Sequence, residues 1–355
     1  MTVRVEKAAS LRLSRLSEHF QHCHSLLIVL QYFPDPDAIA SAMALKLLAY
    51  RSGVTGISVA CGSAPGRVEN LALLRYLKLN LLRLDHLNAN PFERIAMVDA
   101  QPGAGNAGLP PDRIADIVID HHPIRHETRQ VPYHDIRSRY GATSTMLWEY
   151  LEAAGIRPPM RVATALAYGI RSDTSDFGRD SSDADIRALS CLYPLANLRQ
   201  LGRIVHAPLS HSYFRVMVKG LCQARQYGRC TITSLGIIQH PDSLGEVADL
   251  LLREQGIRWT MCHGVWRNQL LISIRTDDEQ AHAGRLLRRA VNRLGHAGGH
   301  AAMAGAQIPL ESAGEAGPLT SSIERRFLVL VNAGNPQPRH LVTPAFIRSL
   351  LRKEP

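Results

Sequence analysis

The stretch that decides the fold covers residues 25–41 and reads SLLIVLQYFPDPDAIAS. Its first six residues form an apolar run, which is typical of a buried β-strand, and residues 33–37 form a loop rich in proline and aspartate. Residues 38–50 are rich in Ala, Leu and Met and therefore predict a helix. A strand, a loop with carboxylates and a helix in this order predict one unit of a parallel α/β sheet.

The same alternation of strand and helix continues to about residue 190. We expect further strands over residues 54–60, 94–98 and 116–119, and helices over residues 11–24, 68–82, 143–154 and 160–170. This pattern indicates a doubly wound parallel sheet, in which ligands bind beyond the carboxyl ends of the strands. Asp99 and Asp120 each follow a predicted strand directly, so we expect both at that edge of the sheet.

The rest of the chain predicts a second, smaller α/β domain. We expect a first domain over residues 1–190, a linker with some helix over 191–225, a second domain over 226–325 and a C-terminal tail over 326–355. In this half, residues 229–238, 270–274 and 327–331 predict strands, and residues 244–254 predict a helix.

The composition is that of an ordinary globular protein. Of 355 residues, 45% are apolar and 20% are charged, which excludes a disordered chain, a fibrous repeat and a small disulfide scaffold. The formal net charge of +10 favours a polyanionic partner, and plain surface charge is the alternative. The six cysteines form no C-x-x-C pair, the first ten residues lack the apolar core of a signal peptide, and no apolar run approaches the roughly 20 residues of a membrane helix. We therefore expect a cytoplasmic protein with no membrane partner.

Carboxylates and imidazoles gather after the predicted strands. Asp35 and Asp37 flank a proline, and Asp120 is followed by His121 and His122. Turn or helix-cap chemistry would explain a single aspartate, but adjacent Asp, His and His after an apolar strand are unusual for a cap. Oxygen-rich sites with an imidazole suit Mn²⁺ or Mg²⁺ better than zinc, and two such ions can activate water against a phosphoryl group. The residues therefore predict metal-assisted hydrolysis of a phosphoester or a phosphoanhydride.

Six elements, taken in order, resemble the motifs of the DHH phosphoesterase family. They are residues 34–41 (PDPDAIAS), Asp99, residues 120–122 (DHH), Asp173, residues 273–275 (SIR) and residues 297–300 (AGGH) followed by Ala304 and Gly305. The last two resemble motifs of the DHHA1 domain of this family. The resemblance covers about residues 15–315, and the compact layout is most similar to the nanoRNase and pAp-phosphatase branch.

The resemblance implies an active site in the cleft between a DHH domain and a DHHA1 domain, with two Mn²⁺ ions, or Mg²⁺ in their place. The metal ligands would be Gln31, Asp35, Asp37, Asp99, His122 and Asp173, with Asp99 and Asp173 shared between the ions. The residues that serve catalysis would be Asp120, which orients the histidines, His121, which faces substrate or supports the site, and His122. The substrate-binding residues would be Arg275, Gly298, Gly299, His300, Thr143 and Ser144, the last two with an ordinary helix cap as the alternative.

The sequence departs from the family pattern at Gln31, where the family carries a histidine ligand. Because an amide oxygen is a poorer donor than imidazole for Mn²⁺, we expect weak binding of the first ion, tolerance of Mg²⁺ or low activity. Ala297 is a milder departure, since the family often has a third glycine there. Four arginines at positions 285, 288, 289 and 293 predict a solvated face, with contacts to substrate phosphates as the alternative.

These observations together predict a metal-dependent hydrolase of very short oligoribonucleotides or small nucleotides that releases 5′-mononucleotides. Its partners would be short RNA or DNA oligonucleotides or small nucleotides, and the oligomeric state stays open, with a homodimer as one option. Alternative substrates of the same chemistry are 3′-phosphoadenosine 5′-phosphate, linear or cyclic dinucleotides and polyphosphate. A weakened nucleotide-binding regulatory protein is the alternative from another class, and Gln31 is the feature that favours it.

Overall fold

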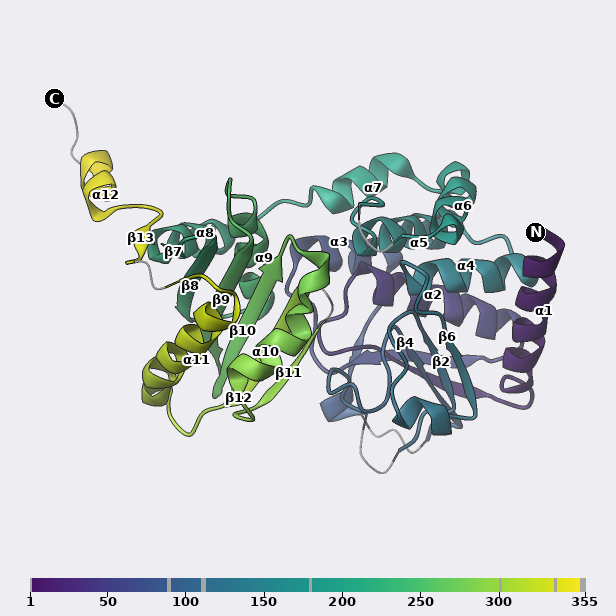
Figure 1. Ribbon diagram of the computed structural model, residues 1–355. Coiled ribbons are helices and arrows are strands. Elements are labelled where there is room, and N and C mark those ends of the chain that lie inside the picture. Colours follow the sequence, from purple (N-terminus) through teal and green to yellow (C-terminus); the bar gives the residue numbers. More distant parts are fainter. Residues whose placement is uncertain are drawn as a thin grey trace. The chain divides into compact units, whose positions relative to one another are not determined.

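The computed structural model describes residues 2–87, 91–109, 113–178, 181–299, 302–334 and 337–351 (Figure 1). The chain divides into two compact units, Met1–Pro208 and Leu209–Pro355. This boundary falls inside the predicted linker, whose residues are mostly helical. Helices α6 (Asp183–Leu192), η3 (Tyr193–Leu195) and α7 (Leu198–Val205) belong to the first unit, and α8 (His211–Gln223) begins the second.

The first unit is built on a parallel six-stranded sheet with the order β3-β2-β1-β4-β5-β6. Its strands are β1 (Ser25–Val29), β2 (Gly56–Cys61), β3 (Leu82–Arg83), β4 (Arg94–Val98), β5 (Ile117–Asp120) and β6 (Tyr133–Ile136). Its other helices are α1 (Thr2–Glu18), α2 (Pro36–Arg51), α3 (Val68–Leu77), η1 (Leu84–His86), η2 (Glu127–Gln130), α4 (Thr143–Ala153) and α5 (Met160–Asp173). The predicted doubly wound parallel sheet is thus confirmed, and its order reverses between β1 and β4, which is where such sheets bind ligands.

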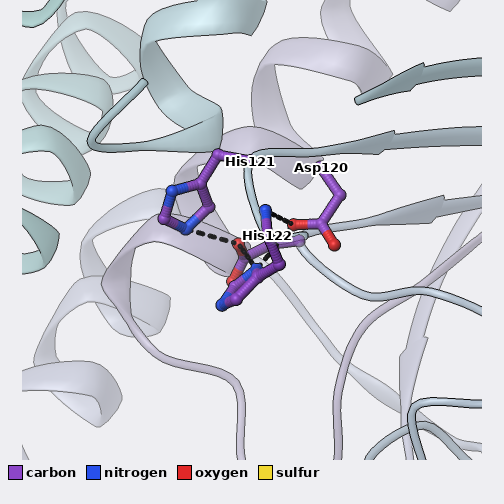
Figure 2. A group of neighbouring side chains, drawn as sticks. Asp120, His121 and His122 are labelled. Carbon is purple, nitrogen blue, oxygen red and sulfur yellow. Dashed lines mark hydrogen bonds and ion pairs between the residues drawn. The ribbon is translucent and has the colours of Figure 1, made fainter. Parts of the chain in front are cut away.

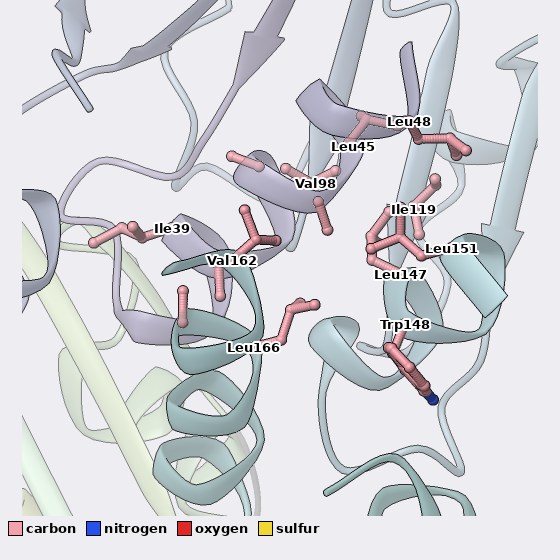
Figure 3. Close-up of a cluster of buried hydrophobic side chains, with 14 of the residues drawn as sticks. Ile39, Leu45, Leu48, Val98, Ile119, Leu147, Trp148, Leu151, Val162 and Leu166 are labelled. Carbon is pink, nitrogen blue, oxygen red and sulfur yellow. The ribbon is translucent and has the colours of Figure 1, made fainter. Parts of the chain in front are cut away.

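Apolar side chains cover both faces of this sheet. Along β1, Leu26 and Ile28 belong to one buried cluster, while Leu27 and Val29 belong to another on the opposite face. Burial on both faces explains why the strand is a continuous apolar run. Figure 3 shows part of the first cluster, where side chains of α2, α4 and α5 gather over the sheet. Each fully buried leucine or isoleucine stabilises the folded state by roughly 1.5–3 kcal/mol, so the sheet holds the loops at the strand ends in fixed positions.

The second unit contains a seven-stranded sheet with the order β11-β12-β10-β9-β8-β7-β13. Its strands are β7 (Arg225–Tyr227), β8 (Cys230–Ile237), β9 (Trp259–Trp266), β10 (Gln269–Thr276), β11 (His296–Gly299), β12 (Met303–Pro309) and β13 (Arg339–His340). Its remaining helices are α9 (Asp242–Leu252), η4 (Glu279–Ala281), α10 (Ala283–Val291), η5 (Ala313–Glu315), α11 (Ala316–Leu330) and α12 (Pro344–Leu351). Strands β8 and β9 run parallel, and the other neighbours run antiparallel. A second α/β domain is therefore confirmed.

Several predicted boundaries are wrong for physical reasons. Residues 327–331, predicted as a strand within the C-terminal tail, belong mainly to helix α11, in which Ile323 and Phe327 are buried one helical turn apart. The unbroken apolar run concealed this helical period. The helix predicted to reach residue 82 ends at Leu77, because Lys78 adopts a left-handed conformation with φ of 55°. Among the described residues, no helix has the length and hydropathy needed to cross a membrane.

Candidate metal centre

The start of helix α2 supplies two carboxylates to the switch point of the sheet. Asp35 is the N-cap of this helix, and its Oδ1 accepts a hydrogen bond from Ala38 N at 2.9 Å. Asp37 lies in the first turn and is fully buried, and its two oxygens accept hydrogen bonds from Thr143 N at 2.7 Å and Ser144 N at 2.8 Å. The free N–H groups at the start of α4 therefore hold a carboxylate of the chain itself. Direct contact of Thr143 and Ser144 with substrate remains a prediction.

Asp99 follows strand β4 in an unusual conformation. Its φ of 54° lies in the left-handed region, which aspartate and asparagine tolerate better than most residues. The residue is buried, and its Oδ1 accepts a hydrogen bond from Thr143 Oγ1 at 3.1 Å. The side chain of Asp99 is thus fixed by the same helix start that holds Asp37.

The two histidines after β5 are oriented by different partners. Asp120 Oδ1 lies 2.6 Å from His122 Nδ1, and this pair is drawn in Figure 2. His121 Nδ1 lies 3.1 Å from the carbonyl oxygen of Tyr140. Because a carbonyl and an ionised carboxylate only accept hydrogen bonds, each ring carries a proton on Nδ1. Asp120 therefore contacts His122, whereas His121 contacts the main chain, and the role of Asp120 in orienting both histidines remains a prediction.

His121 Nε2 points into the carboxylate cluster. It lies 3.0 Å from Asp173 Oδ2, on the last residue of α5, and 3.6 Å from Asp99 Oδ1. This buried nitrogen has no hydrogen bond of good geometry to any described residue, which is what a metal-binding nitrogen would show without its ion. The ligand atoms of Asp37, His121 and Asp173 lie within 4.8 Å of one another, and so do those of a second group, Asp99, Asp120, His121 and His122.

The buried carboxyl groups of the cluster have raised pKa values, and a cation would stabilise their ionised forms. Burial, and then the charge of Asp173, raise the pKa of Asp35 to about 6 and that of Asp37 to about 7. Burial would lower the pKa of His121, but Asp173 and the other carboxylates outweigh it and raise that pKa to about 10. Carboxylate oxygens with one imidazole nitrogen form a donor set that suits Mn²⁺ or Mg²⁺.

Gln31 also lies in the cluster, with its amide in a defined orientation. Its Nε2 lies 3.2 Å from Asp35 Oδ2 and 3.5 Å from Asp99 Oδ2, and its Oε1 accepts a hydrogen bond from Asn106 Nδ2 at 3.3 Å. The structure thus brings together the predicted metal ligands of the first domain, but it turns the nitrogen of Gln31 toward the carboxylates, and Asp35 belongs to neither of the two groups described above.

The sequence analysis missed Gln101, which organises the loops around the histidines. Gln101 Nε2 donates to Asp120 Oδ2 at 2.7 Å, and its Oε1 accepts from Arg125 N and Thr128 Oγ1, both at 2.8 Å. The position two residues after Asp99 was the available signal, although an amide in a loop is too common to stand out.

A second missed residue is Gly169, in the middle of helix α5. A Cβ atom here would lie 2.4 Å from Ser144 Oγ and 3.1 Å from the Cα atom of Asp37. Glycine inside a helix costs roughly 0.5–1 kcal/mol relative to alanine. The close approach of the first turns of α2 and α4 to helix α5 accounts for it here.

The residues predicted to bind substrate in the second domain lie in the second unit. On β10, Arg275 Nε donates to Asp249 Oδ1 at 2.6 Å and its Nη1 to Ser273 Oγ at 2.8 Å. Gly298 and Gly299 lie on β11, which pairs with β12. His300 lies outside the described residues. The arginines at positions 285, 288, 289 and 293 are exposed. The roles of these residues toward a substrate remain predictions.

Comparison with known protein families identifies the class of protein that this fold and site define. Residues 25–170 match the model of the DHH family, N-terminal domain, and residues 228–317 match that of the DHHA1 domain. The chain therefore belongs to the DHH family, as its motifs suggested, and carries a DHH domain followed by a DHHA1 domain.

Individual proteins are also similar to this chain. An uncharacterised protein of Methanocaldococcus jannaschii is 36% identical over 286 residues, which cover 80% of this chain and 58% of that protein. A probable manganese-dependent inorganic pyrophosphatase of Lactobacillus helveticus is 27% identical over 173 residues, or 46% of this chain and 53% of that protein. The chain thus spans little more than half the length of these relatives. The crystal structure of an exopolyphosphatase-related protein from Bacteroides fragilis shares the fold, with a TM-score of 0.66, 17% identity, and coverage of 90% of this chain and 98% of that one.

Proposed function

We propose that this chain is a divalent-metal-dependent phosphoesterase that hydrolyses short oligoribonucleotides or small nucleotides to mononucleotides. The observation that carries the proposal is the convergence of Asp37, His121 and Asp173 within 4.8 Å at the carboxyl edge of the parallel sheet. These groups come from three separate parts of the chain, and their carboxylate oxygens and imidazole nitrogen form a donor set that suits a divalent cation such as Mn²⁺ or Mg²⁺.

The residues around a bound ion would have different roles. Such an ion would supply a Lewis acid for a phosphoryl oxygen and an acidified water. Asp37, Asp173 and the Nε2 atom of His121 would hold it, with Asp99 beside them. The His122 side chain is 29% exposed and that of His121 only 13%, so we assign His121 to the ion and His122 to the substrate. This reverses the roles that the family resemblance implied for the two histidines.

The choice of substrate rests on charge and on one relative. The net charge of +10 supports an anionic substrate with several phosphates. The relative named as a probable manganese-dependent inorganic pyrophosphatase supports a second candidate, the hydrolysis of a phosphoanhydride such as pyrophosphate or polyphosphate. Both candidates use the same metal centre and differ in the group that leaves phosphorus.

A panel of substrates tests the proposal. It contains RNA and DNA from dinucleotides to decanucleotides, 3′-phosphoadenosine 5′-phosphate, a cyclic dinucleotide, pyrophosphate and polyphosphate, each with Mn²⁺ and with Mg²⁺. We expect release of mononucleotides from the shortest RNAs by the wild-type chain and not by Asp37→Asn. Release of phosphate from pyrophosphate or polyphosphate alone would favour the second candidate. Metal-independent binding of dinucleotides without any turnover would instead support a regulatory protein.

A further inference from the structure

We propose that the metal centre holds one divalent ion rather than two, because the side-chain amide of Gln31 occupies the place of the other ion. This inference rests on the metal-dependent function proposed above and specifies the number of ions in that site. It starts from the contacts of Gln31 with Asp35, Asp99 and Asn106. It also uses the separate set of metal-ligand atoms that contains His121.

The described part of the cluster has two sides. On one side, Asp37, His121 and Asp173 have ligand atoms within 4.8 Å of one another and offer an ion two carboxylates and an imidazole nitrogen. On the other side, Asp35 Oδ2 and Asp99 Oδ2 converge on a nitrogen, at 3.2 and 3.5 Å from Gln31 Nε2. A second ion between these two carboxylates would have to take the position of that nitrogen.

The chemistry of the neighbours fixes the orientation of the Gln31 amide. Its NH₂ group has two hydrogens, one for each carboxyl group, and a carboxylate in the ionised form that would bind a cation can only accept hydrogen bonds. Its Oε1 accepts from Asn106 Nδ2 at 3.3 Å. Exchanging the two ends of the amide would place Oε1 against the oxygens of Asp35 and Asp99. The arrangement with nitrogen toward the carboxylates is therefore the stable one.

An amide nitrogen in this position replaces a cation and does not bind one. Its lone pair is delocalised into the carbonyl group, so it offers hydrogen-bond donors where a histidine would offer a ring nitrogen to a metal. Asp35 is also accounted for without an ion, because its Oδ1 caps helix α2 through Ala38 N and its Oδ2 accepts from Gln31. The place between Asp35 Oδ2 and Asp99 Oδ2 thus does not fit an ion. The two groups of ligand atoms that share His121, one of them on the Oδ1 side of Asp99, offer a place for one.

The number of Mn²⁺ ions per chain tests the inference directly. Chelator-treated wild-type protein is titrated with Mn²⁺ by calorimetry, and bound metal is counted after equilibrium dialysis. We expect one ion for the wild type, two for Gln31→His, and an electron paramagnetic resonance spectrum of an isolated Mn²⁺ in the wild type that becomes that of a coupled pair in the variant. Gln223→His, an exposed position at the end of α8, is the matched control for adventitious binding by an added imidazole and should keep one ion.

The outcomes separate this inference from the proposed function. Two ions in the wild type would overturn the inference and leave the proposed function intact, and so would a well-folded Gln31→His that binds one ion as the wild type does. A wild-type protein that binds no Mn²⁺ would contradict the proposed function and the inference together. If Gln31→His does not fold, Asp35→Asn decides, because it keeps an oxygen to cap α2: one ion before and after the change supports the inference, and a loss from two to one overturns it.

Discussion

Two buried aspartates at the ends of neighbouring strands, Asp99 and Asp120, have opposite electrostatic environments. Burial alone would raise the pKa of Asp120, but hydrogen bonds from His122 and Gln101 lower it to about 2. Burial raises the pKa of Asp99 well above the usual value, and nearby carboxylates, Asp35 first among them, raise it further. Hydrogen-bond donors of the chain therefore stabilise the charge of Asp120, whereas the charge of Asp99 would be stabilised by a bound cation.

This difference separates groups that position the site from groups that bind the ion. A carboxylate with its own donors stabilises the folded chain, while a carboxylate among other carboxylates destabilises it until a cation arrives. Substitutions on the two sides should therefore change stability in opposite directions although both reduce activity.

The largest effect is expected from Asp99→Asn. Loss of this carboxylate should reduce turnover by about a thousandfold or more, since metal-ion catalysis supplies several kcal/mol of transition-state stabilisation. Without metal, the same change should raise the melting temperature by a few degrees, because about 1 kcal/mol corresponds to roughly 2–4 °C for a domain of this size. Asparagine also tolerates the left-handed backbone at this position.

Steady-state kinetics with Mn²⁺ and thermal denaturation with chelator measure the two effects of Asp99→Asn. Full activity in excess Mn²⁺ would remove Asp99 from the metal centre. A lower melting temperature in the metal-free variant would show that its charge is not the source of strain.

Asp120→Asn should show a smaller loss of activity and the opposite change in stability. The new NH₂ group would face either the Nδ1–H of His122 or the amide of Gln101, so one buried donor loses its acceptor. We expect turnover to fall about 10–100-fold, as is usual for groups that orient metal-site histidines, and the metal-free melting temperature to fall as well. An unchanged kcat with a raised KM for Mn²⁺ would instead place Asp120 among the direct ligands.

Much of this comparison could be predicted from the sequence. The apolar strands that end in Asp99 and Asp120 predicted both the parallel sheet and the edge at which these residues meet, because alternating strands and helices allow few other arrangements. The opposite charge states of the two residues could not be predicted. They depend on Gln101 and on the helix start at Thr143, whose contacts join segments far apart in the chain.

The orientation of the Gln31 amide could not be predicted from the sequence either. The position of Gln31 was recognised as unusual, but only the neighbouring Asn106 and the two carboxylates determine which end of its amide faces the cluster. The second domain was predicted less completely, because an antiparallel sheet with helices of mixed polarity gives weaker periodic signals than buried parallel strands.

The affinity for Mn²⁺ should rise with pH by at least about tenfold between pH 6 and pH 8. With a pKa of about 7, Asp37 is mostly protonated at pH 6 and ionised at pH 8, and an ion must displace this proton. His121, with a pKa of about 10, also loses a proton when Nε2 binds the ion, which adds to the slope.

Calorimetry in buffers of different ionisation enthalpy measures both the affinity and the protons released. The stability of the metal-free protein should fall over the same interval, because a carboxyl group whose pKa is raised on folding stabilises the folded state only while protonated. Asp120→Asn should leave the slope unchanged, since the pKa of Asp120 lies well below this range. An affinity independent of pH would mean that Asp37 is already ionised without metal.

The smallest effect is expected from Gly169→Ala, which carries no charge and tests the packing behind Asp37. The added methyl group would lie 2.4 Å from Ser144 Oγ, which can rotate, and 3.1 Å from the Asp37 Cα atom, which cannot move without shifting the start of helix α2. We expect overpacking to cost about 1–3 kcal/mol of stability and to weaken Mn²⁺ binding severalfold. Gly202→Ala, on helix α7 with open space around it, is the matched control and should be neutral or slightly stabilising. If both variants bind Mn²⁺ as the wild type does, the first turn of α2, which carries Asp37, adjusts without loss, and the ion rather than the packing fixes its position.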